Sequence, residues 1–200
     1  MLSLLHISDL HFGPHYLPDV GEAVLRAAVT LEPDIIVASG DFTQRAKPRE
    51  YEAAQTFLAR LPPVPLVVTP GNHDIPLYRV MERLFTPYDL YRQHISKDLD
   101  TVLRHPAAVI AAINSTSPLR AITNGRIRSR QLDFCSQAFA GASEQAVRIV
   151  VAHHHFAPAP DYEHSQTLPR AKRALDRFVD LRVDLILGGH LHRAYIGNSL

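Results

Sequence analysis

Short apolar runs rich in β-branched residues recur along the chain and alternate with longer, mixed segments. The runs occupy residues 2–7, 34–39, 65–69, 107–114, 147–152 and 184–188. Because they contain few polar positions, they predict buried strands rather than strands with one solvated face.

The segments between these runs have the apolar spacing of helices. Helices are expected over residues 19–32, 48–61, 130–140 and 169–181, and a further helix over 79–95 should break near Pro87. Strands that alternate with helices favour an α/β layered fold with largely parallel pairing. Residues 114–130 differ, because the tight-turn signal "TNGR" lies between short alternating runs and predicts a hairpin.

Length and composition indicate one globular unit. The 200 residues suffice for a single domain over 1–200, and 46% of them are hydrophobic. The opening "MLSLLHISD" is too short and too polar for a signal peptide or a membrane span, and a single cysteine, Cys135, excludes an internal disulfide. We therefore expect a cytoplasmic protein that does not bind membranes.

The charge balance argues against binding through a broad positively charged surface. The 21 Lys and Arg residues nearly balance the 20 Asp and Glu residues, so nothing in the overall charge attracts nucleic acid or an anionic membrane. Recognition of a phosphate would have to be local. Arg45, Lys47 and Arg49 could supply it, or they could simply form a solvated helix start.

Polar clusters follow five of the six predicted strands: "SDLHFG", "GDFTQ", "GNHD", "HHH" and "GGHLH". Each motif alone has an ordinary interpretation, since "GNHD" is a good turn and "GD" often ends a strand or caps a helix. In α/β sheets, however, the carboxyl ends of the strands meet at one crevice. There the clusters would bring together Asp9, His11, Asp41, Asn72, one residue of His153–His155, His190 and His192.

This set of side chains is typical of a metal site. It mixes imidazole nitrogen with oxygen and has no thiolate, which favours divalent transition metals such as Mn, Fe, Zn or Co. Seven ligands are too many for one tetrahedral site with an open position. They suit two divalent ions that share a carboxylate and lie ~3.5–4 Å apart.

The five motifs resemble the ordered motifs of the calcineurin-like metallophosphoesterases, and among them the bacterial class III cyclic nucleotide phosphodiesterases. The resemblance spans Leu5 to His192 and implies a four-layer α/β/β/α sandwich. It implies one metal bound by Asp9, His11, Asp41 and His192, and a second bound by Asp41, Asn72, a histidine of the run and His190. Asp41 would bridge the ions, and a hydroxide held between them would attack phosphorus.

The resemblance also implies roles for residues beside the metals. His73 would give a proton to the leaving oxygen, and Asp74 would orient His73 or, alternatively, cap the turn. Gly71 would let the backbone come close to the site. Substrate contacts are expected from Asn72, His73 and His154.

The chain departs from the family pattern in two places. Three consecutive histidines replace the usual pair, so the ligand is His153 or, with the register shifted by one, His154, while His155 is expected to be a solvated loop residue. The chain also ends eight residues after His192, where members usually continue with further strands. A shortened member or a fragment would expose a sheet edge, which a homodimer could cover.

Three functions fit these observations. The first is hydrolysis of small phosphodiesters such as 3',5'-cyclic nucleotides. The second keeps the site but changes the substrate to a phosphomonoester, a nucleic-acid end or a glycerophosphodiester. The third is a non-catalytic metal-binding interaction module, in which we would expect at least one ligand to have been replaced. A loop histidine, His164, is a further candidate for contact with substrate.

Overall fold

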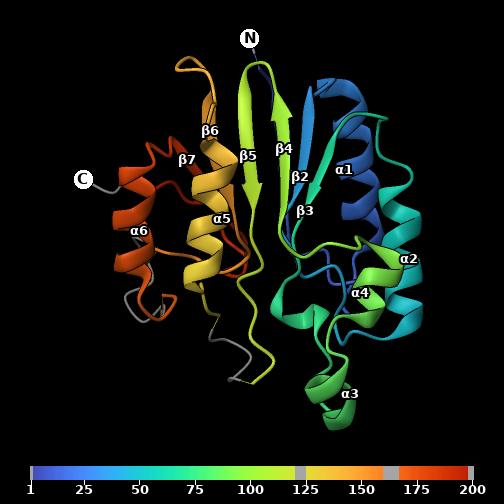
Figure 1. The fold of residues 1–200 in the computed structure, drawn as a ribbon. Helices are drawn as coiled ribbons and strands as arrows, with labels where there is room; N and C mark the ends of the chain where they lie inside the picture. Colours follow the sequence, from blue (N-terminus) through green and yellow to red (C-terminus); the bar gives the residue numbers. More distant parts are fainter. Residues whose placement is uncertain (1, 120–124, 160–166, 198–200) are drawn as a thin grey trace.

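The computed structural model of the chain describes residues 2–119, 125–159 and 167–197, and its strands form two sheets (Figure 1). The first sheet is parallel and consists of β1 (Leu4–Ile7), β2 (Ile35–Ala38) and β3 (Leu66–Val68), in that order. The second consists of β4 (Thr101–His105), β5 (Ala108–Ala112), β6 (Val147–Val151) and β7 (Leu185–Leu187). Only the β4–β5 pair of this sheet is antiparallel.

Helices cover the outer face of each sheet. The first sheet packs against α1 (Pro18–Leu31), α2 (Pro48–Leu58) and α4 (Asp89–His94), and the second against α5 (Ser129–Phe139) and α6 (Ala171–Asp180). Figure 1 shows the resulting order of helices, sheet, sheet and helices. The expected four-layer α/β/β/α sandwich is therefore confirmed. The short helix α3 (Val80–Phe85) projects from one end and buries none of its residues.

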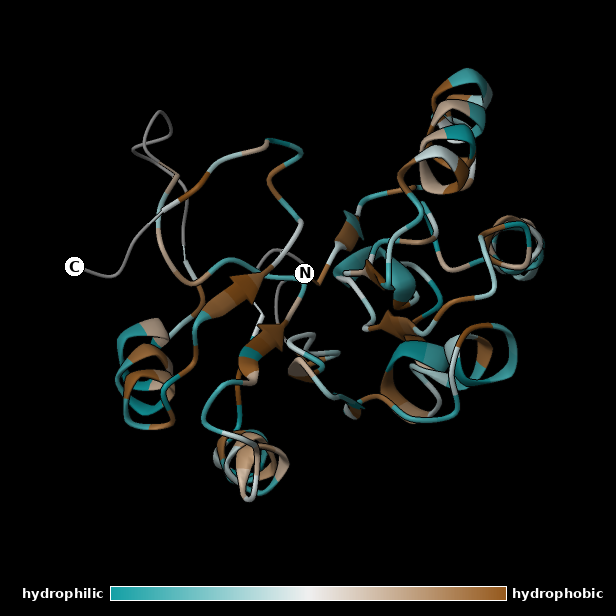
Figure 2. Cartoon of the chain, turned by 90° about the horizontal axis from the view of Figure 1, so that it is seen from above, coloured by the Kyte–Doolittle hydropathy of each residue, from teal (hydrophilic) through white to brown (hydrophobic). Residues whose placement is uncertain are grey.

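The two sheets pack face to face through an apolar layer, and alternation along each strand decides which residues enter it. In β2, Ile35 and Val37 face the second sheet, while Ile36 faces the helices. In β5, Ile110 faces the first sheet and Ala111 faces α5 and α6. Both faces of these strands are buried, which explains their continuous apolar runs. The strand arrows in Figure 2 are mostly brown, the colour of hydrophobic residues.

All six predicted strands are present with shorter bounds, but the prediction missed β4. This strand, "TVLRH", lies at a sheet edge, and its residues alternate between half-buried and exposed. Because charged and polar residues interrupt it, it has no apolar run. It forms a hairpin with β5, in which His105 pairs with Ala108.

The predicted hairpin over 114–130 is wrong for the residues that the structure describes. No strand occurs in 113–119 or 125–128, and residues 120–124 of the expected turn lie outside the described part of the chain. Side chains hold the backbone there instead: the Asn114 N–H donates to Asp100 at 2.7 Å, and the Gln131 amide donates to the Asn114 carbonyl at 2.7 Å. The break near Pro87 is confirmed, because α3 ends at Phe85 and α4 begins at Asp89.

Parallel pairing places the polar clusters at one end of the molecule. The motifs follow β1, β2, β3, β6 and β7 directly, and within each sheet these strands run in the same direction. Within the described residues, no helix is long and apolar enough to cross a membrane.

Candidate metal centre

Backbone hydrogen bonds tie the loops after the strands to one another. The Asp9 N–H donates to the Gly40 carbonyl at 3.0 Å, which joins the loops after β1 and β2. The Gly189 N–H donates to the His153 carbonyl at 2.9 Å, and the His190 N–H donates to the Asp9 carboxylate at 3.1 Å. The loop after β7 thus contacts the loop after β1, although nearly the whole sequence separates them.

One cluster of ligand atoms consists of Asp9, His11 and His192. The two imidazole Nε2 atoms lie 3.0 Å apart, and Asp9 Oδ1 lies 3.8 Å from His11 and 3.4 Å from His192. Two ligand atoms that are each about 2.1 Å from a single ion lie about 3 Å or slightly more from each other. The spacing therefore fits three ligands around one cation.

A second cluster lies on the other side of Asp41. His153 Nε2 is 3.2 Å from Asp41 Oδ2 and 3.0 Å from Asn72 Oδ1. A nitrogen of His190 lies within 4.8 Å of the Asp41 and His153 ligand atoms. The four side chains thus surround one small volume that is suited to a second cation.

Asp41 belongs to both clusters. Its Oδ2 atom is 3.6 Å from His11 Nε2 and 3.2 Å from His153 Nε2, while its Oδ1 accepts the His73 N–H at 2.8 Å. The side chain is buried. A carboxylate between two sets of imidazoles is the arrangement that a bridging ligand requires.

Hydrogen bonds to backbone carbonyls fix the orientation of two imidazole rings. A carbonyl oxygen can only accept, so His153 Nδ1 donates to the Ser39 carbonyl at 2.9 Å and His73 Nδ1 donates to the Gln44 carbonyl at 2.8 Å. In each ring Nε2 then faces the site. For His153 this leaves a lone pair for a metal, which is how proteins usually hold a ligating histidine.

The backbone at the ligands is strained. Five of the expected ligands have left-handed φ angles: Asp9 at 56°, His11 at 49°, Asp41 at 55°, His190 at 76° and His192 at 52°. Each such residue costs on the order of 1 kcal/mol, and strain of this kind concentrates at functional sites. The loops therefore place their side chains at the expense of local stability.

Glycines allow the loops to approach one another. A side chain on Gly71 would collide with the Asp41 carboxylate, and a Cβ on Gly189 would lie 2.5 Å from Asp9 Oδ2. The expectation that Gly71 lets the backbone come close to the site is confirmed. Gly189 has the same role at the first cluster.

Comparison with known proteins places this arrangement in a family. The family model for calcineurin-like phosphoesterases matches residues 2–194. The chain belongs to the calcineurin-like phosphoesterase family. The expected resemblance is thus confirmed.

Curated relatives are similar at modest identity. The UDP-2,3-diacylglucosamine pyrophosphatase LpxG of Chlamydia trachomatis is 33% identical over 62% of the chain, which spans only 32% of that protein's length. A probable cyclic nucleotide phosphodiesterase of Synechococcus is 27% identical over 98% of the chain and 75% of that protein. Among solved structures, the purple acid phosphatase PPD1 from yellow lupin seeds has a TM-score of 0.68 at 14% identity, over 96% of this chain and 38% of that one. This last similarity concerns the fold.

Burial and neighbouring charges set the protonation of this calcineurin-like site. Burial alone would raise the pKa of Asp41, but His153 beside it holds that pKa below its usual range. Burial alone would lower the pKa of His153, but Asp41 raises it to about 9. Burial and the neighbouring His153 lower the pKa of His190 to about 4. The site thus pairs the ionised Asp41 carboxylate with positive charge on His153. A divalent cation that binds here would replace the proton of His153.

The structure places a ring nitrogen of His153, rather than one of His154, among the ligand atoms of the second cluster. His154 Nδ1 lies 2.8 Å from Ser115 Oγ, which also accepts the backbone N–H of His154 at 3.1 Å. The His154 ring lies 4.7 Å from that of His190, so it packs beside the second cluster. This geometry favours the first of the two registers.

Two sequence expectations need correction. His155 is buried rather than solvated, and its ring stacks on that of His190 with centroids 5.8 Å apart. Asp74 does not orient His73, because the Gln44 carbonyl holds that ring. The Asp74 carboxylate accepts the backbone N–H groups of Phe42, Thr43 and Gly71 at 3.2, 2.9 and 2.9 Å, which matches the alternative of a turn-capping role. His164 lies outside the described residues.

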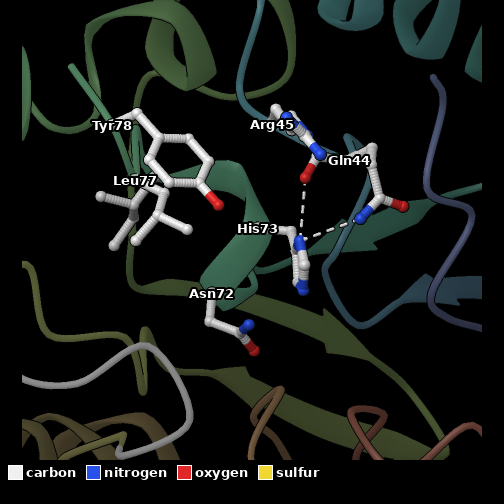
Figure 3. Close-up of a pocket in the computed structure, with 7 residues that line it drawn as sticks. Gln44, Arg45, Asn72, His73, Leu77 and Tyr78 are labelled. Carbon is white, nitrogen blue, oxygen red and sulfur yellow. Dashed lines mark hydrogen bonds between the residues drawn. The ribbon is translucent and has the colours of Figure 1, made fainter. Parts of the chain in front are cut away.

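A small pocket opens beside the metal cluster. Asn72 and His73 line it together with Gln44, Arg45, Ile75, Leu77 and Tyr78 (Figure 3). Sequence reasoning did not assign Gln44 or Tyr78. Gln44 holds His73 through its backbone carbonyl, and a backbone contact leaves no signal in the sequence. For Tyr78, the only available signal was its position close to "GNHD" in the chain.

Proposed function

We propose that the chain is a two-metal phosphodiesterase that hydrolyses small phosphodiesters, with 3',5'-cyclic nucleotides as the candidate substrates. The observation that carries the proposal is the position of Asp41 Oδ2, 3.6 Å from His11 in one cluster and 3.2 Å from His153 in the other. One carboxylate that serves two metal sites is the basis of two-metal hydrolysis.

The proposed ligands divide into one set for each ion. Asp9, His11, Asp41 and His192 would hold one ion, and Asp41, Asn72, His153 and His190 the other. When bound, such a pair of ions activates water as a nucleophile and neutralises charge on the phosphate. Mn, Fe, Zn and Co fit the mixed nitrogen and oxygen donors.

His73 is positioned to act on the leaving oxygen. Its Nδ1–H remains on the Gln44 carbonyl, so the second proton of the imidazolium form would be carried by Nε2, which faces the site. Transfer of this proton to the departing alkoxide would neutralise it as the P–O bond breaks. Asn72 lines the same pocket as His73, and His154 packs against His190 of the second cluster; both are the proposed additional contacts to the substrate phosphate.

The preference for diesters has support from the relatives. Two relatives bear the names of a probable cyclic nucleotide phosphodiesterase and a glycerophosphodiester phosphodiesterase, and a third is named as a pyrophosphatase. The nearly neutral net charge of +1 also favours small substrates over long nucleic acids. The single domain, the cytoplasmic location and the homodimer stay predictions from the sequence.

Hydrolysis by the metal-reconstituted protein tests the proposal. The substrates would be cyclic nucleotides, bis(p-nitrophenyl) phosphate, glycerophosphodiesters and p-nitrophenyl phosphate. We expect diesters to be cleaved faster than the monoester. Activity towards cyclic nucleotides should be lost in His73→Ala but not in His15→Ala, since His15 is exposed and outside both clusters. Faster cleavage of the monoester than of every diester would refute the phosphodiesterase assignment.

A further inference from the structure

The pocket beside His73 combines apolar and polar walls. Ile75, Leu77 and Tyr78 supply carbon surface, and Gln44 and Arg45 supply hydrogen-bonding groups. Its volume is about 110 Å³. Because His73 lines this pocket and also belongs to a metal-site group with His11 and Asp41, the pocket adjoins the proposed metal centre.

Tyr78 and Arg45 form the rim of the pocket. The Arg45 guanidinium lies 5.7 Å from the centroid of the Tyr78 ring, and 71% of the Tyr78 residue surface is exposed. Figure 3 shows the two side chains beside His73, with the Tyr78 hydroxyl directed towards the interior of the pocket. A phenol ring and a planar guanidinium are the surfaces on which proteins stack unpaired bases.

The Gln44 side chain provides groups that can read the edge of a ring. Its Nε2 lies 3.4 Å from His73 Nδ1, but the hydrogen on that nitrogen is donated to the Gln44 carbonyl at the shorter distance of 2.8 Å. A nitrogen that carries a hydrogen has no lone pair to accept another, so the Gln44 amide stays available to a ligand.

The position of His73 decides which part of a substrate enters this space. The proposed proton donor must lie within hydrogen-bond distance of the departing oxygen. Whatever that oxygen carries therefore extends along the walls that His73 shares with Gln44 and Tyr78. We propose that the pocket is the leaving-group subsite and that it binds a flat, hydrogen-bonding ring of the nucleobase type. This inference rests on the proposed function and deepens it.

Binding of products to the metal-loaded protein tests the subsite without catalysis. Adenosine 5'-monophosphate and ribose 5-phosphate differ only at C1', which carries adenine in the first and a hydroxyl in the second, so the ratio of their dissociation constants reports the contribution of the base. We expect AMP to bind roughly 5- to 150-fold tighter in calorimetric titration, the range that stacking of one base on an aromatic side chain gives. AMP that binds no tighter than ribose 5-phosphate would overturn the proposal.

Variants of Tyr78 assign the preference to this pocket. Tyr78→Leu should remove most of the AMP preference, and Tyr78→Phe should keep it, since the ring is retained. The matched control is Phe85→Leu, because Phe85 is 73% exposed on α3 and does not line the pocket. An unchanged preference in Tyr78→Leu, or an equal loss in Phe85→Leu, would contradict the proposal.

Turnover separates the subsite from the function on which it rests. Tyr78→Leu should raise KM for a cyclic nucleotide and leave KM for dimethyl phosphate unchanged, with similar kcat for each substrate. If the protein prefers AMP but cleaves no diester, the proposed function fails, and only the binding of a nucleobase in this pocket stands. If both diesters are cleaved and Tyr78→Leu raises both KM values equally, the subsite fails and the function stands.

Discussion

Replacing Gly40 by alanine would test the close approach of the loops that build the metal centre. Gly40 has a φ angle of +91°, and a Cβ on it would lie 2.6 Å from the Gly71 nitrogen, 2.8 Å from the Gly71 Cα and 2.9 Å from His153 Nδ1. Two of these three neighbours are backbone atoms, so no side-chain rotation can relieve the overlap. The residues displaced would be those that carry or flank ligands of the second cluster.

The expected loss of stability has two parts. The left-handed backbone costs an alanine about 1–2 kcal/mol, and forcing an extra methyl group into a packed site costs about 1–3 kcal/mol. Gly141 provides the matched control, because its φ angle is +73° and a Cβ there would have no atom of the described residues within 4 Å. Gly141→Ala therefore has only the backbone cost. We expect Gly40→Ala to lose about 1–3 kcal/mol more than the control.

Urea unfolding in the presence of a chelator measures this difference, because removing metal prevents a change in metal affinity from altering apparent stability. Metal content after reconstitution is then measured separately by elemental analysis. We expect Gly40→Ala to retain less metal than the wild type and Gly141→Ala to retain as much. Equal losses of stability and equal metal content in both variants would show that the loops do not approach as closely as described.

Three further predictions concern the site residues. His73→Ala should slow hydrolysis of a cyclic nucleotide by about 10²–10⁴-fold, but slow a nitrophenyl diester much less, because nitrophenolate leaves without a proton; equal slowing of both would contradict the proton-donor role. His153→Ala should lower metal occupancy, whereas His154→Ala should lower turnover or substrate affinity and keep the metal; the opposite ranking in elemental analysis would shift the register by one. Asp41→Ala should lose more metal and more activity than Asn72→Ala, because Asp41 contacts both clusters; equal retention would remove its bridging role.

The parts of the site that could be predicted from the sequence are those in which side-chain chemistry follows a strand. Asp41 and Asn72 come directly after buried strands, and parallel pairing brings such positions to one edge. The same reasoning gave the layered fold, since runs such as β5 have no polar position and must be covered on both faces. Local sequence was sufficient wherever the determining interaction was apolar burial.

Predictions failed or left alternatives open where the determining interaction came from a distant backbone or side chain. The carbonyl of Ser39 fixes the His153 ring, and any residue can supply a carbonyl. The burial of His155 depends on its stacking against His190, which lies on another strand loop. The strand β4 was missed because an edge strand tolerates residues such as Arg104 on its exposed face. No short sequence pattern marks any of these three features.

The measurement that tests the two-metal centre most directly combines metal analysis with electron paramagnetic resonance of the Mn(II)-reconstituted protein. Because Asp41 lies between two ligand clusters, we expect about two ions per chain, ~3.5–4 Å apart and therefore exchange-coupled in the spectrum. Asp41→Ala should abolish the coupling. Saturation at one ion per chain, or two ions with uncoupled spectra in the wild type, would contradict a centre bridged by Asp41.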